Sequence, residues 1–353
     1  ENPSIDVACI GEGECTLLEL IKSLEENKDL SEVKGIAYRR NGVIKRNPPQ
    51  PFIKNLDELP FPARHLLPMN RYRALGKKFV PGTVLTSRGC PFRCIFCSSS
   101  LLFGKKFRGR SPENVVNELE DLQVEYKVHD IELLDDLFTF DQKRAEAICQ
   151  EILDRKLDVR WVCSSRVDTI TKRLMMKLKE AGCALIYLGV ESGSQRVLGL
   201  IKKGIRIEQS IRALKWAKEV GIETIASFVL GVPGETKEEM EQTIRFAKKL
   251  NPDYAQFTIA TPYPGTELYE KAMEQGLLSE NNWSQYTVLR PTVATENFTL
   301  KDLEKILSKA YKQFYLRPFY LLRHLIKGRL SLFLKAFRTI ALPSLRLRLR
   351  AHT

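Results

Sequence analysis

Six apolar runs alternate with stretches of helical periodicity, and this alternation limits the fold more than any other feature of the chain. The expected strands cover residues 82–87, 130–136, 159–163, 184–190, 224–231 and 254–260. The expected helices between them cover residues 111–127, 141–155, 171–181, 207–220 and 236–250. Strands that alternate with helices form a parallel sheet. Six repeats are two short of the eight that close a TIM barrel. We therefore predict an α/β chain with an open (βα)6 partial TIM barrel, whose chemistry lies at the carboxyl ends of the strands.

The residues before this region have a different pattern. Residues 5–10 are apolar enough for a buried strand, GEGE at 11–14 predicts a turn, and residues 15–26 have helical periodicity. A parallel strand needs neighbours, and this βα fragment has no partner strands of its own. We interpret it as the end of a truncated α/β domain. Residues 33–45 predict a hairpin, and the Pro-rich stretch that follows predicts an extended linker.

Three of the eight cysteines lie directly after the first expected strand, with the spacing Cys90-x3-Cys94-x2-Cys97. The other five are scattered, which is not the pattern of a secreted disulfide framework and favours a reducing compartment. Three thiolates in one tight loop can bind three irons of a [4Fe–4S] cluster, whereas ferredoxins supply a fourth cysteine. The open iron can bind a cofactor or substrate directly. A zinc knuckle and structural cysteines are the alternatives, but zinc needs a fourth ligand at short spacing, and the next histidine is His129.

Charged side chains follow the later strands. Asp135 and Asp136 are adjacent carboxylates at a strand end, where helix capping is the alternative role. Arg166 ends the third strand and can pair bidentately with a carboxylate, and a surface ion pair with Asp168 is the alternative. Glu191 ends the fourth strand, and its carboxylate suits the hydroxyl groups of a ribose.

The sequence CPFRCIFC resembles the radical S-adenosylmethionine (SAM) superfamily, and the resemblance extends from about residue 80 to residue 290. It implies that Cys90, Cys94 and Cys97 hold the cluster and that the open iron chelates the amino and carboxylate groups of SAM. One electron from the cluster then cleaves a carbon–sulfur bond to give a 5′-deoxyadenosyl radical. The candidate catalytic residues are Asp135, Arg166 and Glu191. The residues expected to contact the cofactor are Phe96, Asp135, Asp136, Arg166, Glu191, Ser192, Gly231 and Thr261.

Each of these contacts has an implied partner on SAM. Phe96 and Gly231 lie near the adenine, Thr261 contacts the adenosine, and the fourth-strand motif with Ser192 contacts the ribose. One of the two aspartates holds the ammonium group of the methionyl part. Many family members have Gly-Gly-Glu at that position, so the Asp-Asp pair departs from the pattern.

The motifs DDLF, SSRVD, GVESGS, GVPGET and TPYPGTELY resemble the branch of this superfamily that carries an N-terminal cobalamin-binding domain. In that branch a Rossmann-like domain ends in a strand and a GEGE-type turn. The resemblance divides the chain into the end of a truncated cobalamin-binding-like domain (1–30), a hairpin and Pro-rich linker (31–80), the radical SAM core barrel (81–290) and a helical, basic, amphipathic region (291–353).

We therefore expect a radical SAM enzyme that uses a [4Fe–4S] cluster, SAM and, through a missing N-terminal domain, cobalamin. The expected reaction is methylation or remodelling of an unactivated carbon in a lipid-like or small-molecule substrate. The expected electron donor is a flavodoxin or ferredoxin. Two alternatives stay open: a tRNA-modifying enzyme of the methylthiotransferase type and a non-catalytic, membrane-associated iron–sulfur protein.

The end of the chain is strongly basic, because residues 317–353 hold nine Lys or Arg and no Asp or Glu. Apolar residues fill much of the rest, and an apolar face with a basic edge that includes Arg323 predicts contact with an anionic membrane through residues 317–350. A barrel-capping helix and an RNA contact are the alternatives. Nucleic acid is the least favoured partner, because the rest of the chain is nearly balanced in charge. We expect a cytoplasmic protein, with peripheral contact at the inner face of the membrane as one alternative.

Overall fold

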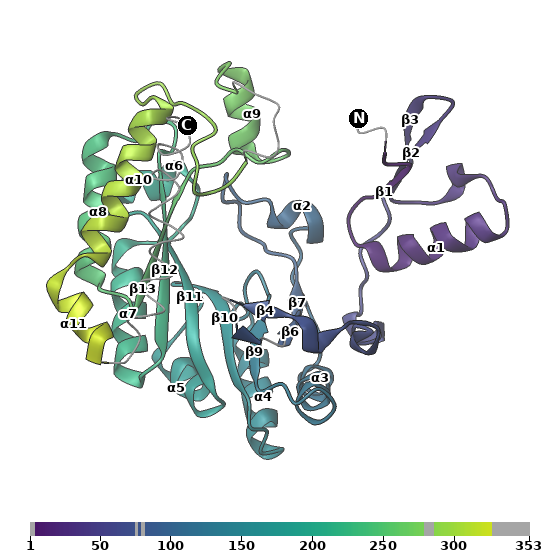
Figure 1. Ribbon diagram of the computed structural model, residues 1–353, viewed down its shortest axis with the longest axis horizontal. Coiled ribbons are helices and arrows are strands. Elements are labelled where there is room, and N and C mark those ends of the chain that lie inside the picture. Colours follow the sequence, from purple (N-terminus) through teal and green to yellow (C-terminus); the bar gives the residue numbers. More distant parts are fainter. Residues whose placement is uncertain (1–3, 75–76, 79–81, 279–285, 327–353) are drawn as a thin grey trace. The chain divides into compact units, whose positions relative to one another are not determined.

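The computed structural model describes residues 4–74, 77–78, 82–278 and 286–326 (Figure 1). The chain divides into two compact units. The first unit holds residues up to 93 together with 97–165 and 169–186, and the second holds 94–96, 166–168 and the residues from 187 onward. Strand β11 (Cys183–Glu191) begins in the first unit and ends in the second.

Six strands form the main sheet, in the order β13-β12-β11-β10-β9-β6. Besides β11 they are β6 (Gly82–Val84), β9 (Asp130–Leu133), β10 (Arg160–Arg166), β12 (Glu223–Leu230) and β13 (Tyr254–Ile259). The pairs β6–β9, β9–β10 and β12–β13 are parallel. The order along the sheet is the order along the chain, so the predicted α/β architecture with six parallel strands is confirmed.

Three helices of the first unit pack beside one another: α3 (Pro112–Val124), α4 (Gln142–Asp154) and α5 (Lys172–Glu180). Each begins where the sequence predicts, because a polar side chain caps its first turn. Ser111, Asp141 and Thr171 accept hydrogen bonds from the backbone N–H three residues further on. Smaller elements of this unit are α2 (Ser99–Phe103), β4 (Arg73–Ala74), β5 (Lys77–Lys78), β7 (Ser87–Arg88) and β8 (Arg108–Gly109).

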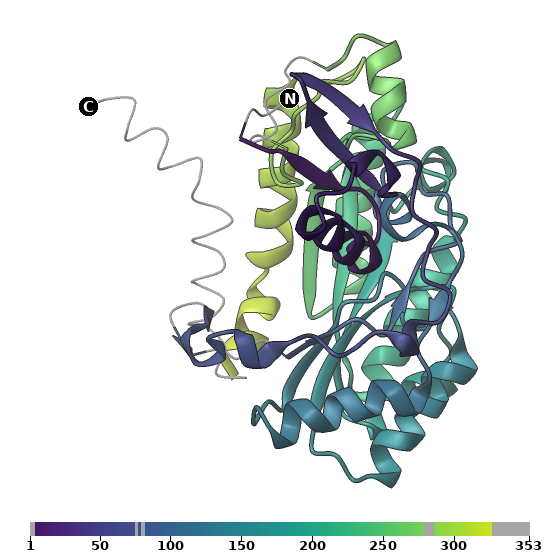
Figure 2. The ribbon, with the colours of Figure 1, turned by 90° about the vertical axis from the view of Figure 1, so that its right-hand side faces the viewer.

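The helices of the second unit are α6 (Gln195–Leu200), α7 (Ile207–Val220), α8 (Lys237–Leu250), α9 (Glu267–Glu274), α10 (Leu300–Tyr315) and α11 (Pro318–Ile326). Helices α8 and α10 lie side by side against β12 and β13 (Figures 1 and 2). The hydroxyls of Tyr311 and Tyr315 donate to the carbonyls of Phe257 (2.9 Å) and Ala255 (2.8 Å). The same hydroxyls accept from the N–H groups of these residues. Helix α10 therefore satisfies polar groups that the edge strand β13 would otherwise expose.

The N-terminal strand has partners, contrary to our expectation. Strand β1 (Val7–Cys9) pairs antiparallel with β2 (Ile36–Arg40), which pairs with β3 (Val43–Arg46). The backbone N–H and C=O groups of β1 need hydrogen-bond partners. The predicted hairpin, β2 and β3, supplies them, so β1 becomes the third strand of that small sheet. Nor is β1 fully buried, because Ala8 and Cys9 are exposed.

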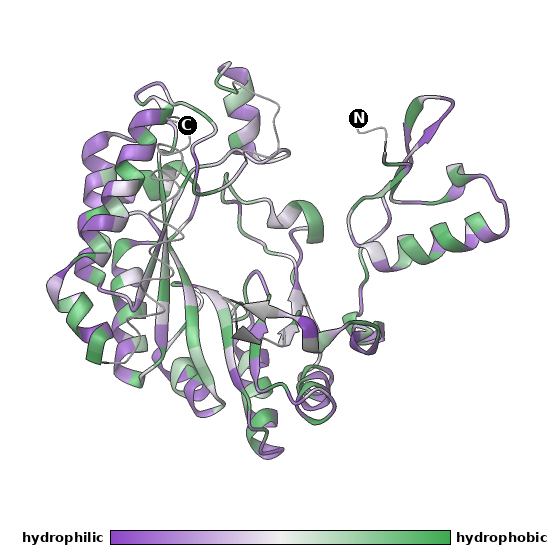
Figure 3. Cartoon of the chain, viewed as in Figure 1, coloured by the Kyte–Doolittle hydropathy of each residue, from purple (hydrophilic) through white to green (hydrophobic). Residues whose placement is uncertain are grey.

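Helix α1 (Gly13–Glu25) packs only part of its apolar surface. Leu20 lies in a small core with Val33, Ile36 and Tyr38. Four other apolar side chains of the helix are about half exposed: Leu17, Leu18, Ile21 and Leu24. Figure 3 shows that α1 carries several hydrophobic segments along its length.

The Pro-rich segment is packed rather than loosely extended. It contains three 3-10 turns, Leu56–Glu58, Arg64–Leu66 and Met69–Arg71. The Asp57 carboxylate accepts from the backbone N–H of Ser111, the cap of α3 (2.9 Å). The Arg64 guanidinium is buried and donates to Glu118 on α3 (2.5 Å). These contacts fix the segment on the first unit.

Most of the basic tail, residues 327–353, lies outside the described residues. In the part that is described, Tyr320 and His324 of α11 are buried, and the Tyr320 hydroxyl donates to the Asp253 carbonyl (2.7 Å). Arg323, expected on a basic edge, pairs with the Asp253 carboxylate instead. One side of α11 thus caps the second unit. Within the described residues, no helix is both long and apolar enough to span a bilayer.

Candidate functional site

The cysteine loop begins at a position that only glycine can occupy. Gly89 has φ +87°, and a Cβ there would lie 2.2 Å from the Lys106 carbonyl oxygen. The N–H of Cys90 then donates to the Gly104 carbonyl (3.3 Å). Cys90 and Cys94 are half-buried and Cys97 is exposed. Across the described ranges, no three Cys, His, Asp or Glu side chains are already gathered as a metal site. The donor set itself, three thiols within eight residues, suits three irons of a [4Fe–4S] cluster.

The middle of the loop is held by backbone hydrogen bonds within the second unit. The N–H of Ile95 donates to the carbonyl of Ile201 (3.1 Å), and the Ile95 carbonyl accepts from the N–H of Leu268 (3.0 Å). The Ile95 side chain is buried, whereas Phe96, expected near the adenine, is half-buried. Residues 94–96 therefore have a fixed backbone path that places Cys94 beside the end of β10.

Arg166, the last residue of β10, makes three kinds of contact. Its guanidinium donates bidentately to the Asp168 carboxylate (2.9 Å for both bonds), to the Lys203 carbonyl (2.6 Å) and to the Cys94 sulfur (3.8 Å). Arg166 is 5% exposed, so its pair with Asp168 is buried rather than a surface ion pair. Hydrogen bonds to the cysteine sulfurs are one way in which a protein tunes an iron–sulfur cluster. The sequence identified Arg166 but not its contact with Cys94.

Glu191, the last residue of β11, is buried and paired with Lys203. The Lys203 ammonium donates to the carboxylate at 2.6 Å, and the Ser227 hydroxyl lies 3.4 Å from the other oxygen. Glu191 has φ +66°, a conformation that non-glycine residues rarely adopt and that is common at functional sites. Sequence reasoning missed Lys203, and no pattern around it distinguishes it from the exposed Lys202 beside it.

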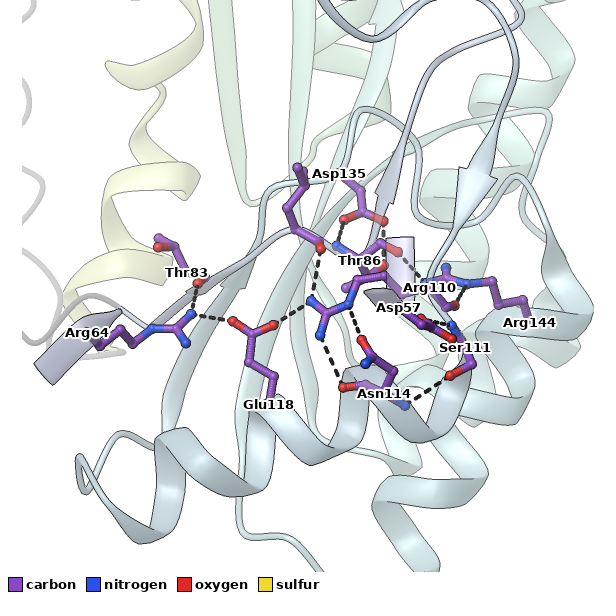
Figure 4. A network of polar contacts seen from close by, with 11 residues as sticks. Asp57, Arg64, Thr83, Thr86, Arg110, Ser111, Asn114, Glu118, Asp135 and Arg144 are labelled. Carbon is purple, nitrogen blue, oxygen red and sulfur yellow. Dashed lines mark hydrogen bonds and ion pairs between the residues drawn. The ribbon is translucent and has the colours of Figure 1, made fainter. Parts of the chain in front are cut away.

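The two aspartates after β9 point to different surroundings. Asp135 is buried, and its carboxylate accepts from the Thr86 N–H and hydroxyl (2.6 Å each) and from the Ser87 hydroxyl (Figure 4). Burial raises the pKa of Asp135, although these hydrogen bonds oppose the rise. Asp136 is exposed. Asp135 therefore anchors the segment between β6 and β7, which explains why β6 ends earlier than predicted, and Asp136 has the more accessible carboxylate.

A buried ion-pair network also holds the segment between β6 and β7 (Figure 4). Glu118 on α3 is 1% exposed and accepts from both Arg64 (2.5 Å) and Arg110. The Arg144 guanidinium donates to the carbonyls of Thr86 (2.6 Å) and Arg110 (2.7 Å). Glu118 therefore links α3 to Arg64 and Arg110, and Arg144 links α4 to the backbone of Thr86 and Arg110. Together these contacts fix α3 and α4 to the segment that leads to the cysteines.

The remaining predicted residues shape loops at the strand ends. The Ser192 hydroxyl shares a hydrogen bond with Thr243 (3.0 Å) and accepts from the Ser194 N–H (3.0 Å). The Thr261 hydroxyl donates to the Ile259 carbonyl (3.0 Å). Gly231 has φ +73°, and its N–H donates to the Glu235 carboxylate (2.7 Å). Both hydroxyls thus already have protein partners.

Glu235 is fully buried in the loop after β12, and this was not expected from the sequence. One carboxylate oxygen accepts from the N–H groups of Gly231 (2.7 Å) and Val232 (3.0 Å). The other oxygen has no hydrogen-bond partner among the described residues. Burial raises the pKa of Glu235 to about 8 despite the two N–H donors. The side chain is therefore folded back under the Gly231–Val232 turn.

The GEGE turn is joined to the cysteine loop through arginines. The Glu12 carboxylate is buried and accepts from Arg88 (2.9 Å), Arg108 (2.9 Å) and the Ile53 N–H (2.7 Å). Burial opposes ionisation, but the hydrogen bonds from Arg108 and Arg88 hold the pKa of Glu12 below its ordinary value. Arg88 is two residues before Cys90. The turn predicted over 11–14 is shorter in the structure, because α1 begins at Gly13. The sequence did not predict the partners of Glu12, which come from far along the chain.

Comparison with known proteins defines the class. The family model described as the Radical SAM superfamily matches residues 84–247. An uncharacterised methyltransferase of Pyrococcus horikoshii is 48% identical over 96% of this chain and 73% of its own length. The anaerobic magnesium-protoporphyrin IX monomethyl ester cyclase of Rubrivivax gelatinosus is 30% identical over 91% of this chain and 58% of its own.

Solved structures share the fold. The cobalamin-dependent SAM radical enzyme OxsB, solved with aqua-cobalamin and SAM bound, superposes with a TM-score of 0.70 at 20% identity, over 95% of this chain and 55% of that one. The chain belongs to the radical SAM superfamily and is an enzyme of that class. Membership implies a [4Fe–4S] cluster and SAM as cofactors. The chain spans between about half and three quarters of the length of these relatives.

Proposed function

We propose that this chain is the catalytic barrel of a cobalamin-dependent radical SAM enzyme that methylates or remodels an unactivated carbon. The observation that carries the proposal is the group formed by Cys94, Arg166, Lys203 and Glu191, in which a cationic donor faces a cysteine sulfur and a strained, buried carboxylate lies nearby. Methyl transfer is supported by the name of the 48% identical relative. Cobalamin dependence is supported by the name of OxsB, whose fold the chain shares.

In this proposal Cys90, Cys94 and Cys97 hold three irons of the cluster, which supplies the electron for reductive cleavage of SAM. Glu191 receives the ribose hydroxyls, and Phe96 lies along the adenine. We assign the ammonium contact to Asp136, because the oxygens of Asp135 already accept three hydrogen bonds. Ser192, Gly231 and Thr261 shape the loops that face the adenosine, since their polar groups are satisfied within the protein.

The proposed partners follow from the chemistry. The reductant is a flavodoxin or ferredoxin, because the cluster must receive one electron for each cleavage. The substrate is a small molecule. Cobalamin is the proposed further cofactor, and the domain limits at residues 30, 80 and 290 belong to the same proposal.

Methyl transfer is tested with the protein, hydroxocobalamin, a chemical reductant that converts the corrinoid to cob(I)alamin, and SAM carrying a deuterated methyl group. Bound corrinoid absorbance and a deuterated methyl group on the corrinoid are expected, together with S-adenosylhomocysteine. A reconstituted protein that cleaves SAM but retains no corrinoid contradicts cobalamin dependence and leaves the radical step standing.

We also propose contact with an anionic lipid surface. The side of α11 that faces away from the second unit is apolar, with Phe319 86% exposed and Ile326 77% exposed, and the residues that follow are basic and lack acids. Binding to anionic vesicles that is lost in a variant ending at Ile326 is expected. Equal sedimentation of both proteins with neutral and anionic vesicles contradicts it.

A further inference from the structure

Lys203 contacts two functional residues through two different groups. Its side-chain ammonium donates to the Glu191 carboxylate at 2.6 Å, and its backbone carbonyl accepts from the Arg166 guanidinium at 2.6 Å. Arg166 in turn donates to the Cys94 sulfur. Lys203 is 6% exposed, and Glu191 and Arg166 are each 5% exposed. One residue in the loop after α6 therefore connects a cysteine of the loop to the carboxylate at the end of β11.

The Lys203–Glu191 pair occupies a space that the fold leaves open for it. An added Cβ at Gly189 would lie 2.6 Å from the Glu191 oxygen and 2.6 Å from the Lys203 nitrogen. Glu191 is held at φ +66° at the same place. The pair thus depends on three features at one place: the missing Cβ of Gly189, the positive φ of Glu191 and the buried side chain of Lys203.

Stability alone does not account for such a pair. Two buried charges lose their hydration, and their attraction often fails to offset that loss, so an apolar pair of the same size would serve the core as well. Strained backbone persists where the surrounding structure enforces it, and it clusters at functional sites. The Lys203 ammonium holds one oxygen of the Glu191 carboxylate, and the other oxygen accepts a long hydrogen bond from the Ser227 hydroxyl (3.4 Å).

We propose that Lys203 is a positioning residue for SAM binding, which orients the Glu191 carboxylate through its ammonium while its carbonyl orients Arg166 against Cys94. This inference rests on the proposed function of Glu191 and of the cysteine loop. We call the ammonium contact with Glu191 the Glu191 arm and the carbonyl contact with Arg166 the Arg166 arm. The two arms can be tested separately, because a side-chain substitution at Lys203 removes the ammonium and keeps the backbone carbonyl. Lys203→Met therefore affects the Glu191 arm and spares the Arg166 arm.

The test uses the reconstituted protein and measures iron content, the reduction potential of the cluster and SAM affinity by equilibrium dialysis. Lys203→Met is expected to keep its iron and its potential while SAM affinity falls by about 10- to 100-fold, the usual cost of removing a residue that orients a ligand-binding group. The double variant Arg166→Gln/Asp168→Asn removes the other arm without leaving an unpaired charge. It is expected to shift the potential to more negative values, because a hydrogen bond to a cluster sulfur is lost.

Two glycine variants complete the test without changing any charge. The Cβ added in Gly189→Ala would clash with the Glu191 oxygen and the Lys203 nitrogen. This variant is therefore expected to weaken SAM binding as Lys203→Met does. Gly199→Ala in α6, where an added Cβ meets nothing within 4 Å, is the matched control and is expected to bind SAM as the wild type does. Circular dichroism verifies that each variant is folded.

The outcomes separate this inference from the function on which it rests. Folded Lys203→Met or Gly189→Ala protein with wild-type SAM affinity overturns the positioning role and leaves the proposed function intact. Loss of iron in Lys203→Met in parallel with loss of SAM binding also overturns it, because the lysine would then support the loop as a whole. A wild-type protein that assembles a cluster but does not bind SAM overturns the proposed function itself.

Discussion

Glu235→Gln is expected to stabilise the protein, and to do so by about 2.5 kcal/mol more at pH 7.5 than at pH 5.5. Burial raises the pKa of Glu235 from its ordinary value of 4.5 to about 8, so the folded protein keeps the proton over a range in which the unfolded chain releases it. The stability gained from this proton is fully present below pH 4.5 and is lost as the pH rises through about 8. The substitution is conservative, because the glutamine carbonyl can still accept from the N–H groups of Gly231 and Val232.

The magnitude follows from proton linkage. One proton bound to the folded state alone changes the free energy of unfolding by about 1.4 kcal/mol per pH unit. Between pH 5.5 and 7.5 the wild type should therefore lose about 2.5 kcal/mol that Glu235→Gln does not lose. The assay is urea unfolding of both proteins at the two pH values, and the difference between them cancels every other titrating group. If the free energies of unfolding of the wild type and Glu235→Gln differ by the same amount at both pH values, Glu235 ionises normally. That result would refute the claim that burial raises its pKa.

Further predictions concern the framework around the site. Glu118→Gln should lower the free energy of unfolding by about 3–5 kcal/mol, because it leaves the buried Arg64 and Arg110 without their counter-charge. The control Glu120→Gln removes an exposed pair with Arg155 and should cost less than about 1 kcal/mol; equal losses in the two urea titrations contradict the prediction. Gly182→Ala should destabilise by about 1–3 kcal/mol more than Gly221→Ala, since both have positive φ but only the first places its Cβ 2.2 Å from a backbone oxygen, that of Val159. Equal melting temperatures for these two variants would rule this out. Native alkylation followed by mass spectrometry should modify two exposed thiols outside the cysteine loop, Cys9 and Cys15, well before the buried thiols of Cys149, Cys163 and Cys183. Labelling of both groups at one rate would show that the core opens readily.

The sequence was sufficient to predict the barrel elements because their signals are local. The helix predicted over 207–220 is found as Ile207–Val220, and each of the strands of the main sheet lies within a few residues of its predicted run. Capping side chains and terminal glycines act within one turn, so they can be recognised without knowledge of the fold. The early end of β6 is explained by the hydrogen bonds of Thr86 and Ser87 with Asp135, which is far along the chain.

The site was predictable in its residue types and less so in its contacts. Arg166 and Glu191 were identified because a charged residue at the end of an apolar strand is unusual. Their partner Lys203 was not, because it follows a short helix in a run of ordinary charged residues. The same reasoning applies at the N-terminus, where β1 finds its partner in the hairpin that follows α1. Tertiary pairing between distant segments is not encoded in local periodicity.

The most direct test of this account is whether the protein cleaves SAM reductively. The protein is reconstituted anaerobically with iron and sulfide, reduced, and incubated with SAM, and the products are measured by mass spectrometry, with Cys97→Ala as the matched control. We expect about four irons per chain and 5′-deoxyadenosine from the wild type, and none from Cys97→Ala. A folded wild-type protein that assembles no cluster, or 5′-deoxyadenosine formed equally by both proteins, would contradict the assignment of this loop as the cluster site.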